Sequence, residues 1–541
     1  MVLASLRASI PRLFPSKSAF HGIPNAKLHV THIANYNKLS IPSGSGGVKI
    51  GNKLKENSNK NRELILQILK LTTTRRETNS YLNKYSIFDG SGGTNTVSRL
   101  LFFKIKGNLL EYPSEDLVKF TKTLSHVKKL GGQPVLILDP DHLLQNTSAP
   151  FKAFNNYLYE QFNYLSSLNA SHDEFKLIPL PTVLTHDFEQ KLNVEIPHDI
   201  FVHQKNIPVL FPILYDFVSS KHFIVNSTDF ITNVLSQIDN SPDSYTIEKV
   251  VFIDKFGGVP SIERSNNSNV LINLRHEYEE ILGELQIGHI PFPERQIHID
   301  NLNNFQTILN CVKSPENINM TGIITTLSIA TEPIGTNPII FNMLTDRSLI
   351  SSSLPTGKIN DQIARRISKT SIVKNGVSIH EITKVSDLDL TKFKALIDDS
   401  FKRPLDLQHY LDRISKNLLK IIIVGDYDGI AIVTNEFSQS TGLHVPYLDK
   451  FAISRKSQGI LALADIIWNL LRQSFGDELL WRSRKNNPVN SWYFQRSSGS
   501  YNLSNEFRVF WLTNTKGTRL SNQKLTAYIE IGEMIKPSWE S

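Results

Sequence analysis

Cysteine is almost absent from this chain of 541 residues, since Cys311 is the only one. A single cysteine can form neither an intramolecular disulfide nor a cysteine-based zinc cluster, and such scarcity fits a reducing compartment. Long hydrophobic runs are lacking as well. The longest uncharged stretch, near residues 317–331, is too short and too polar to cross a bilayer. We therefore expect no membrane span and no metal site.

Acidic residues are absent from the first 55 positions, which carry eight lysines and arginines. These eight account for the whole formal net charge of +8, so the remainder of the chain is neutral. A neutral folded part lacks the basic surface on which binding to nucleic acid depends, and we expect no nucleic-acid partner.

The same basic segment has an apolar helical periodicity, at Leu3, Leu6, Ile10, Leu13 and Phe14. Apolar periodicity combined with a lack of acids predicts a mitochondrial presequence and a location in the matrix; the alternative is an ordinary disordered basic tail. The glycine and serine residues at 43–47 predict a flexible linker, so residues 1–55 are assigned to presequence and linker.

A chain of this length requires at least two hydrophobic cores. A helix is expected over 61–83, and apolar strands alternate with helices from 98 to 353, which indicates an α/β domain with a mostly parallel sheet and helices on both faces. The expected strands are 100–105, 134–138, 208–213, 250–253 and 322–325. The expected helices are 114–130, 151–168, 229–237 and 301–312. The first domain is thus predicted over 61–353, followed by a polar linker over 354–375.

A second α/β domain is predicted over 376–541. Its expected strands are 377–382, 420–424, 430–433, 447–454, 479–484 and 508–512, and its expected helices are 388–401, 407–417 and 460–475. The pair Asp428-Gly429 between two apolar strands predicts a hairpin. Charge gathers at the strand ends between 447 and 493, where ligands of open α/β sheets bind.

The order of elements in this second domain resembles the GNAT acetyltransferase fold. The strings YLDKF (447–451), RKSQG (455–459), WRSRKNNP (481–488) and NSWYFQRS (490–497) resemble the mitochondrial N-acetylglutamate synthase family. Residues 74–82 resemble the N-terminal helix of that family, and the first domain is similar, more loosely, to an amino-acid kinase domain. The resemblance implies transfer of acetyl from acetyl-CoA to L-glutamate, the first step towards ornithine and arginine.

The glycine-rich loops that hold nucleotide phosphates in amino-acid kinases are altered in this chain. Lys104 is followed by a single glycine, and the second loop contains Asp139, Pro140 and Asp141, which repel phosphate or lack an N–H donor. We expect no phosphoryl transfer; Lys104 and Asp229 are either relics or structural residues. The resemblance implies that the domain instead binds L-arginine as a feedback inhibitor and forms homo-oligomers, with a tetramer suspected, and that the protein associates with acetylglutamate kinase.

The basic turn 455–459 is the predicted acetyl-CoA site, because a pyrophosphate binds N–H groups at a helix N-terminus. Its predicted binding residues are Arg455, Lys456, Gln458 and Gly459. A glycine before a helix is by itself more often structural punctuation. Acetyl-CoA is expected as co-substrate, with no permanently bound cofactor.

Glutamate presents two carboxylates, which arginines bind bidentately. Arg482 and Arg484 lie two apart on one strand and so share a face; the alternative is a solvated edge strand, against which the apolar neighbours of the pair argue. Lys450, Tyr447 and, more weakly, Arg403 complete the predicted glutamate site. Tyr447 and Lys450 can both line it only if their strand is bulged.

No cysteine is available in this stretch, which favours direct attack in a ternary complex. Phe451 and Ile453 are the predicted sources of a backbone N–H for the thioester carbonyl. Tyr493 is predicted to protonate the departing thiolate, with Asn487 orienting the sulfur or the substrate. No general base is evident, and a water relay is expected. The rival functions are a bifunctional synthase and kinase, and a non-catalytic arginine-sensing scaffold.

Overall fold

The computed structural model describes most of the chain beyond position 97. The described residues are 98–144, 150–169, 174–189, 191–196, 206–240, 245–264, 267–315, 317–355, 369–457, 462–503, 506–513 and 520–540. The predicted presequence and linker (1–55), the predicted helix 61–83, and Gln458 and Gly459 lie outside them. None of the described helices combines the length and the apolar composition needed to cross a membrane.

The first domain is built on an eight-stranded sheet in which only β11 and β12 pair antiparallel. In spatial order its strands are β10 (Leu271–Asn273), β12 (Ser371–Lys374), β11 (Thr321–Thr326), β9 (Tyr245–Asp254), β1 (Ser98–Ile105), β2 (Gly132–Ile137), β6 (Asn206–Leu210) and β3 (Lys176–Leu180). A small second sheet consists of β5 (Leu192–Val194), β4 (Leu184–His186), β7 (Ile213–Asp216) and β8 (Lys221–Ile224).

Helices cover both faces of the large sheet, which explains why its strands read as continuous apolar runs. One face packs against α4 (Ser114–Lys129), α6 (Phe151–Asn169), α11 (Leu327–Ala330) and α12 (Pro338–Thr345). The other face packs against α8 (Ser227–Asp239), α9 (Leu274–Gln286) and α10 (Phe292–Cys311). The short α5 (Asp141–Leu144) follows β2. The predicted parallel-rich sheet with helices on both faces is confirmed.

The segment predicted as a linker, 354–375, contains β12. This strand pairs with both β10 and β11, so the last residues of that segment complete the first sheet and are not linker. Its four residues (SIVK) are too short a run to stand out among the polar residues around them, and only the pairing with two neighbours identifies it.

The second domain has a seven-stranded sheet in which only β16 and β17 pair parallel. In spatial order its strands are β13 (Ile379–Ile382), β14 (Leu418–Val424), β15 (Gly429–Phe437), β16 (His444–Ile453), β17 (Glu478–Arg484), β19 (Phe507–Thr513) and β18 (Gly499–Asn502). The predicted hairpin between β14 and β15 is confirmed, with Val424 paired to Gly429.

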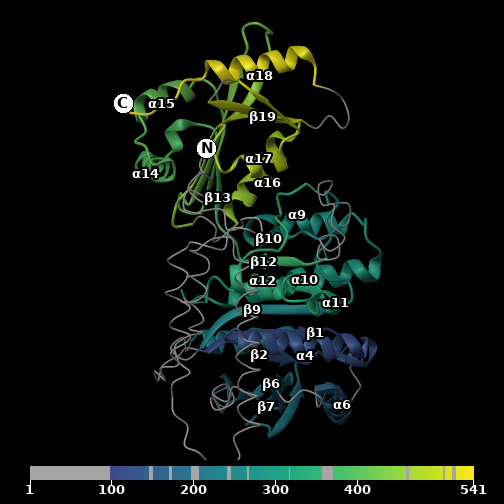
Figure 1. Ribbon diagram of the computed structural model, residues 1–541. Coiled ribbons are helices and arrows are strands. Elements are labelled where there is room, and N and C mark those ends of the chain that lie inside the picture. Colours follow the sequence, from purple (N-terminus) through teal and green to yellow (C-terminus); the bar gives the residue numbers. More distant parts are fainter. Residues whose placement is uncertain are drawn as a thin grey trace, which may run out of the picture.

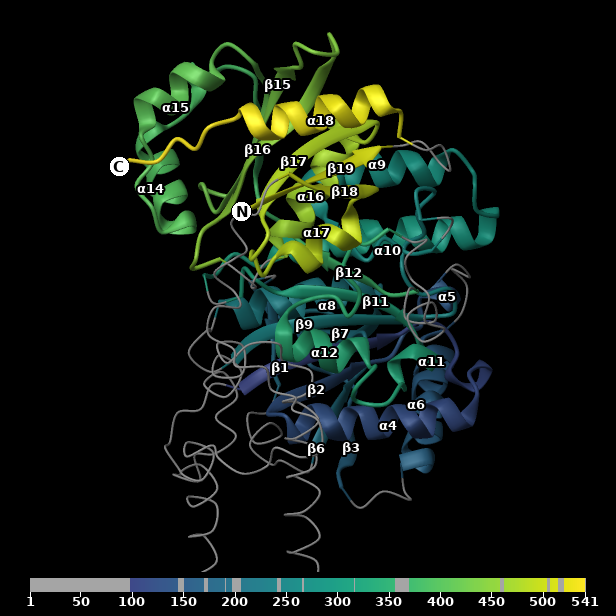
Figure 2. The same cartoon turned by 45° about the horizontal axis from the view of Figure 1, so that its top comes forward.

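Two layers of helices enclose this second sheet. α14 (Leu390–Phe401), α15 (Leu407–Ile414) and α18 (Asn522–Met534) cover one face, while α16 (Leu463–Phe475) and α17 (Asn490–Arg496) cover the other. Figure 1 shows the second domain stacked on the first, with α16 and α17 towards the junction and α18 on the far side. The turned view in Figure 2 separates α14 and α15 from α16 and α17 across the sheet. Sequence analysis missed both α18 and β18.

Gly322, at the centre of β11, should not tolerate alanine. A Cβ there would lie 2.5 Å from Cε1 of Phe305, whose ring is fully buried. Overpacking of this kind costs about 1–3 kcal/mol, so Gly322→Ala should lower the denaturant midpoint of the first domain. Gly283→Ala in α9 is the matched control, because nothing lies within 4 Å of its Cβ position. Equal unfolding midpoints for the two variants would contradict the packing argument.

Candidate functional site

The pairing of β16 with β17 ends within the stretch that holds most of the predicted site residues. The two strands pair only at Tyr447 with Leu480 and at Leu448 with Trp481. β16 then continues to Ile453, while β17 stays paired with β19 along its whole length. In the described part of the chain, the edge of β16 that faces β17 therefore has no neighbouring strand beyond Leu448.

β16 carries a bulge at Asp449. Sequence analysis predicted that Tyr447 and Lys450 could share a face only if their strand was bulged. Asp449 has no partner in β15, because the register shifts between Ile432 and Val433. A bulge turns the following side chain by one position. Tyr447 packs beneath α18 and the Lys450 ammonium lies over an aromatic ring of α15, so both face the same helical layer.

Arg482 and Arg484 lie on this face too, since Leu480, two residues earlier, packs against α18. Arg482 Nη1 donates to the Gly532 carbonyl oxygen at 2.6 Å, and its guanidinium lies 4.5 Å from the centre of the Phe507 ring. Arg482 Nε is buried and has no hydrogen-bond partner among the described residues. Neither arginine forms an ion pair with a carboxylate of the described chain.

A buried carboxylate at the bulge was missed by sequence analysis. Asp449 Oδ2 accepts hydrogen bonds from the Tyr410 hydroxyl at 2.7 Å and from Lys450 Nζ at 2.9 Å. Arg413 of α15 donates to Asp449 Oδ1 and lies 3.3 Å from Glu436 Oε1. The sequence did contain one signal for this cluster, the aspartate within the apolar YLDKF strand. It contained none for Arg413, because a cation in the last turn of a helix is common.

The charges in this cluster shift each other's pKa. Burial alone would raise the pKa of the Asp449 carboxyl, but the Lys450 ammonium and the Arg413 guanidinium lower it to about 2. Burial lowers the pKa of Lys450, against the opposing effect of Asp449. The Lys450 ammonium also lies 5.5 Å from the centre of the Trp539 ring, so an aromatic side chain near the C-terminal end covers it.

Tyr493 lies on the opposite face of the sheet from the arginines. It is buried among the rings of Trp481, Trp492 and Phe510, whose centroids lie 5.6–5.7 Å away. Burial raises the pKa of its phenol, and the nearby Tyr447 phenol adds to this.

Asn487 is occupied within the turn that joins β17 to α17. Its Nδ2 donates to Ser483 Oγ at 2.8 Å, and its Oδ1 accepts from the Val489 N–H at 3.1 Å. Asn487 is thus buried and stabilises this turn. Its contact with the CoA sulfur or the substrate stays a prediction.

The turn after β16 holds its two described cations near carboxylates. The Arg455 N–H donates to Asp399 Oδ2 at 2.8 Å, and Lys456 Nζ lies 3.3 Å from Asp428 Oδ1. Both side chains are largely exposed, and exposed ion pairs of this kind contribute about 0–1 kcal/mol. They can therefore exchange a carboxylate for another anion at little cost.

The remaining predicted residues divide between the two sides of the sheet. Phe451 and Ile453 lie beyond the point where the strands part, on the side that packs against α16 and α17. Arg403 is exposed in the turn after α14, and the structure does not bring it to Lys450 or the arginines within the described contacts.

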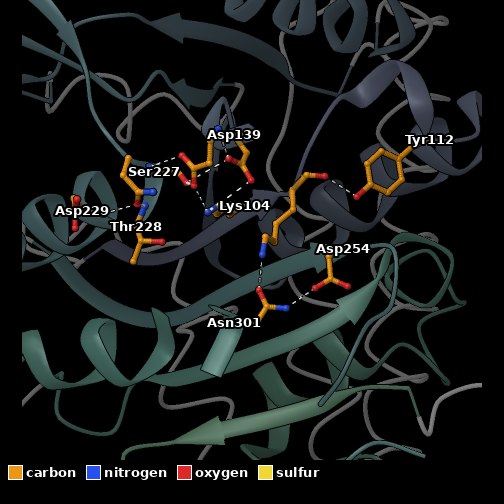
Figure 3. A network of polar contacts seen from close by, with 11 residues as sticks. Lys104, Tyr112, Asp139, Ser227, Thr228, Asp229, Asp254 and Asn301 are labelled. Carbon is orange, nitrogen blue, oxygen red and sulfur yellow. Dashed lines mark hydrogen bonds and ion pairs between the residues drawn. The ribbon is translucent and has the colours of Figure 1, made fainter. Parts of the chain in front are cut away.

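The corner of the first domain that holds the two altered loops is filled by a network of its own side chains (Figure 3). Lys104 is almost fully buried, with its Nζ 3.2 Å from Asp141 Oδ2 and 3.7 Å from Asp139 Oδ2. Ser227, at the start of α8, donates its N–H to Asp141 Oδ1 at 2.8 Å. Asp229 is exposed in the next part of that turn, and no described contact joins it to Lys104.

A second buried chain of contacts lies beside this corner. Lys106 Nζ donates to Asn301 Oδ1 at 2.8 Å, and Asn301 Nδ2 donates to Asp254 Oδ2 at 2.5 Å. Burial lowers the pKa of Lys106 and raises that of Asp254. Among the described residues, no three histidines, cysteines or carboxylates come together in a group that could hold a metal ion.

Residues 378–530 match the family model of the N-acetyltransferase domain of N-acetylglutamate synthase. The mitochondrial amino-acid acetyltransferase of Candida albicans is 38% identical over 568 aligned positions, covering 88% of this chain and 96% of the relative. The chain belongs to the mitochondrial amino-acid acetyltransferase family. The acetyltransferase of Debaryomyces hansenii is 34% identical, covering 89% of this chain and 96% of its own.

Membership of the acetyltransferase family confirms the predicted enzyme class and the predicted mitochondrial location. Among solved structures, an N-acetylglutamate synthase from Neisseria gonorrhoeae, complexed with coenzyme A and L-arginine, is 13% identical, with a TM-score of 0.35. That comparison covers 82% of this chain and 98% of the other.

Asp449→Asn should destabilise the acetyltransferase domain at neutral pH by about 3–5 kcal/mol, because the substitution leaves Lys450 buried without its carboxylate and Arg413 with Glu436 alone. The pKa of Asp449 is about 2 in the folded protein, below its ordinary value. Its stabilising effect is therefore complete above the unfolded pKa and disappears as pH falls through the folded pKa. The stability gap between wild type and variant should narrow as pH drops from about 4 to 2.

Urea unfolding at several pH values measures this gap. Asp412→Asn is the matched control, since Asp412 lies on the exposed side of α15 and accepts a hydrogen bond from Gln408. A stability difference that stays constant down to pH 2 would show that folding does not lower the pKa of Asp449.

Proposed function

We propose that this acetyltransferase forms N-acetyl-L-glutamate from L-glutamate and acetyl-CoA. The observation that carries the proposal is the pair Arg482 and Arg484, which share a face and have no carboxylate partner in the described chain. Other cations on that face, Lys450 and Arg413, are compensated by Asp449. Two uncompensated guanidiniums match the two carboxylates of glutamate.

The acceptor and the acetyl donor are proposed to approach from opposite faces of the sheet. Glutamate binds against Arg482, Arg484, Lys450 and Tyr447, with Arg403 at the periphery. Acetyl-CoA lies on the side of α16, with its pyrophosphate at Arg455, Lys456, Gln458 and Gly459. The end of the pairing between β16 and β17 at Leu448 supports this arrangement, because the amine and the thioester can meet only where no ladder hydrogen bonds join the two strands.

The proposed reaction is a direct attack in a ternary complex. The neutral amine forms a bond to the thioester carbonyl carbon, the carbon–sulfur bond breaks, and the thiolate takes a proton. A backbone N–H at Phe451 or Ile453 polarises the carbonyl. Tyr493 supplies the proton, since a phenol is protonated at neutral pH.

The general base is proposed to be a chain of water molecules. Asp449 is a buried carboxylate next to Lys450 of the proposed glutamate site, but a pKa of about 2 makes it a poor base. Its oxygens already accept from Tyr410, Lys450 and Arg413. Asp449 acts instead by holding Lys450, and Asn487 by holding the turn before α17.

The first domain is proposed to be regulatory and inactive as a kinase. The network around Lys104 supports this, because Asp139 and Asp141 already pair with the ammonium that a phosphate would need. The family resemblance is the basis for four further proposals. These are inhibition by L-arginine, assembly into homo-oligomers (as tetramers), association with acetylglutamate kinase and a location in the matrix.

Arg482→Ala should raise the KM for glutamate by roughly 10- to 100-fold, since each charged hydrogen bond contributes about 1.5–3 kcal/mol. The KM for acetyl-CoA should stay within about twofold, because the donor binds on the other face. The measurement is glutamate-dependent CoA release by the purified protein.

Arg508→Ala is the control for this substitution. Arg508 lies on the adjacent β19, but its guanidinium lies over the Phe494 ring of α17 and is therefore on the opposite face. An unchanged glutamate KM in Arg482→Ala would reject the acceptor site. Absence of CoA release from the wild-type protein would reject the proposed function in favour of a sensing scaffold.

Incubation with N-acetylglutamate, ATP and Mg²⁺ should yield no ADP, because carboxylates neutralise Lys104 where a kinase would bind phosphate. A coupled assay for ADP measures this, with CoA release in the same preparation as proof of an intact enzyme. Enzyme-dependent ADP formation would favour the bifunctional synthase and kinase.

A further inference from the structure

Three consecutive serines, Ser351–Ser353, occupy the junction between the two domains. They follow α12, and Ser352 and Ser353 are buried. The first domain anchors them through Arg264, whose Nη1 donates to the Ser352 carbonyl oxygen at 3.0 Å in a buried contact. The serine hydroxyls at 351 and 353 are directed instead to the acetyltransferase domain.

The acetyltransferase domain binds this segment through one carboxylate and one guanidinium. Asp465, in the first turn of α16, accepts hydrogen bonds from the Ser351 hydroxyl at 2.9 Å and from the Ser353 hydroxyl. Arg496, the last residue of α17, donates from Nε to Ser353 Oγ at 2.7 Å and from Nη2 to Ser351 Oγ at 2.6 Å. Arg496 Nη2 also lies 3.3 Å from Asp465 Oδ1, which closes the ring.

Arg496 connects this ring to the residues around the proposed proton donor. Its guanidinium lies 3.9 Å from the centre of the Trp492 ring, and its Nη1 donates to the Trp492 carbonyl oxygen at 3.2 Å. Trp492 packs in turn against Tyr493 and Phe451, at 5.6 and 5.9 Å between centroids. Arg496 itself is only 2% exposed, so its charge depends on these partners.

The helix that carries Tyr493 needs such support. α17 has seven residues, and a helix of this length has little stability of its own in water. Its direction is therefore set by the packing of its rings against the sheet and by contacts at its ends. The contacts at its C-terminal end include the ring of Ser351, Ser353, Asp465 and Arg496. A shift of α17 by a fraction of an ångström would move the phenol relative to the thiolate.

We propose that Arg496 is a positioning residue for acetyl transfer, acting through Tyr493. It fixes α17 to the serine segment of the first domain, so the placement of the proton donor depends on the first domain. This inference rests on the proposed function, because Tyr493 is assigned its role there. It also gives the first domain a physical connection to the catalytic step.

A double-mutant cycle tests this dependence. Arg496→Met should lower kcat for glutamate-dependent CoA release by about tenfold, because misplacement of a reacting group is costly, and leave the glutamate KM within about twofold. In a Tyr493→Phe background, where no phenol proton remains to be positioned, the same substitution should lower kcat by no more than about twofold. Arg496→Lys should not restore the rate, since lysine lacks the planar fork that spans both serines.

A second variant keeps Arg496 in place. Ser351→Ala combined with Ser353→Ala should lower kcat by about threefold in the Tyr493 background and not in the phenylalanine background. Ser352→Ala is the matched control, because the Ser352 hydroxyl has no hydrogen-bond partner among the described residues. It should leave kcat unchanged.

Equal loss of kcat in the tyrosine and phenylalanine backgrounds would overturn the inference, since Arg496 would then act on the fold in general. An unchanged kcat in both the arginine and the double-serine variants would overturn it as well. These outcomes leave the proposed function standing. Full activity of Tyr493→Phe, or absence of CoA release from the wild type, would overturn the role of Tyr493 or the proposed function and this inference with it.

Discussion

The Asp449 carboxylate holds Lys450, Arg413 and the Tyr410 hydroxyl at the place where β16 has one residue more than β15. Both features depend on each other. The extra residue turns Lys450 towards the helical layer of α15, and the carboxylate offsets the cost of burying two cations there. Without the bulge, Tyr447 and Lys450 would point to opposite sides of the sheet, and the acceptor face would lose one of them.

The two domains differ in whether carboxylates compensate their cationic side chains. In the first domain Lys104 is neutralised by Asp139 and Asp141, and the corner is electrostatically closed. In the second, Arg482 and Arg484 have no carboxylate among the described residues, and the face they share attracts anions. Similar polar residues thus give a charge-compensated corner in one sheet and a pair of uncompensated guanidiniums, the proposed glutamate site, in the other.

Much of the fold followed from local patterns. The continuous apolar run of β1 and the amphipathic α4 were predicted nearly to their ends, because both strand and helix are buried by neighbours in the expected layers. β12 was missed because its four residues gain their stability from pairing with β10 and β11. α18 was missed because its polar sequence gives little amphipathic signal and its buried residues Ala527, Tyr528 and Ile531 are few.

In the candidate site, too, features set by local spacing were predicted and contacts between distant residues were not. The spacing of Arg482 and Arg484 placed them on one face, and the requirement for a bulge between Tyr447 and Lys450 was readable from their separation. The side chains that pair with the site residues could not be predicted from the sequence. Arg413 reaches Asp449 across 36 positions, and Ser353 reaches Arg496 across 143, so only the folded chain brings them together.

Residues close to the C-terminal end contribute directly to the proposed acceptor face. The Gly532 carbonyl accepts from Arg482, and the Trp539 ring covers Lys450. Every strand of the first sheet, in contrast, lies before Asn375. A chain shortened by α18 and the residues after it would therefore keep the whole of the first sheet. In the second domain, Arg482 would lose its carbonyl partner and Lys450 its aromatic cover.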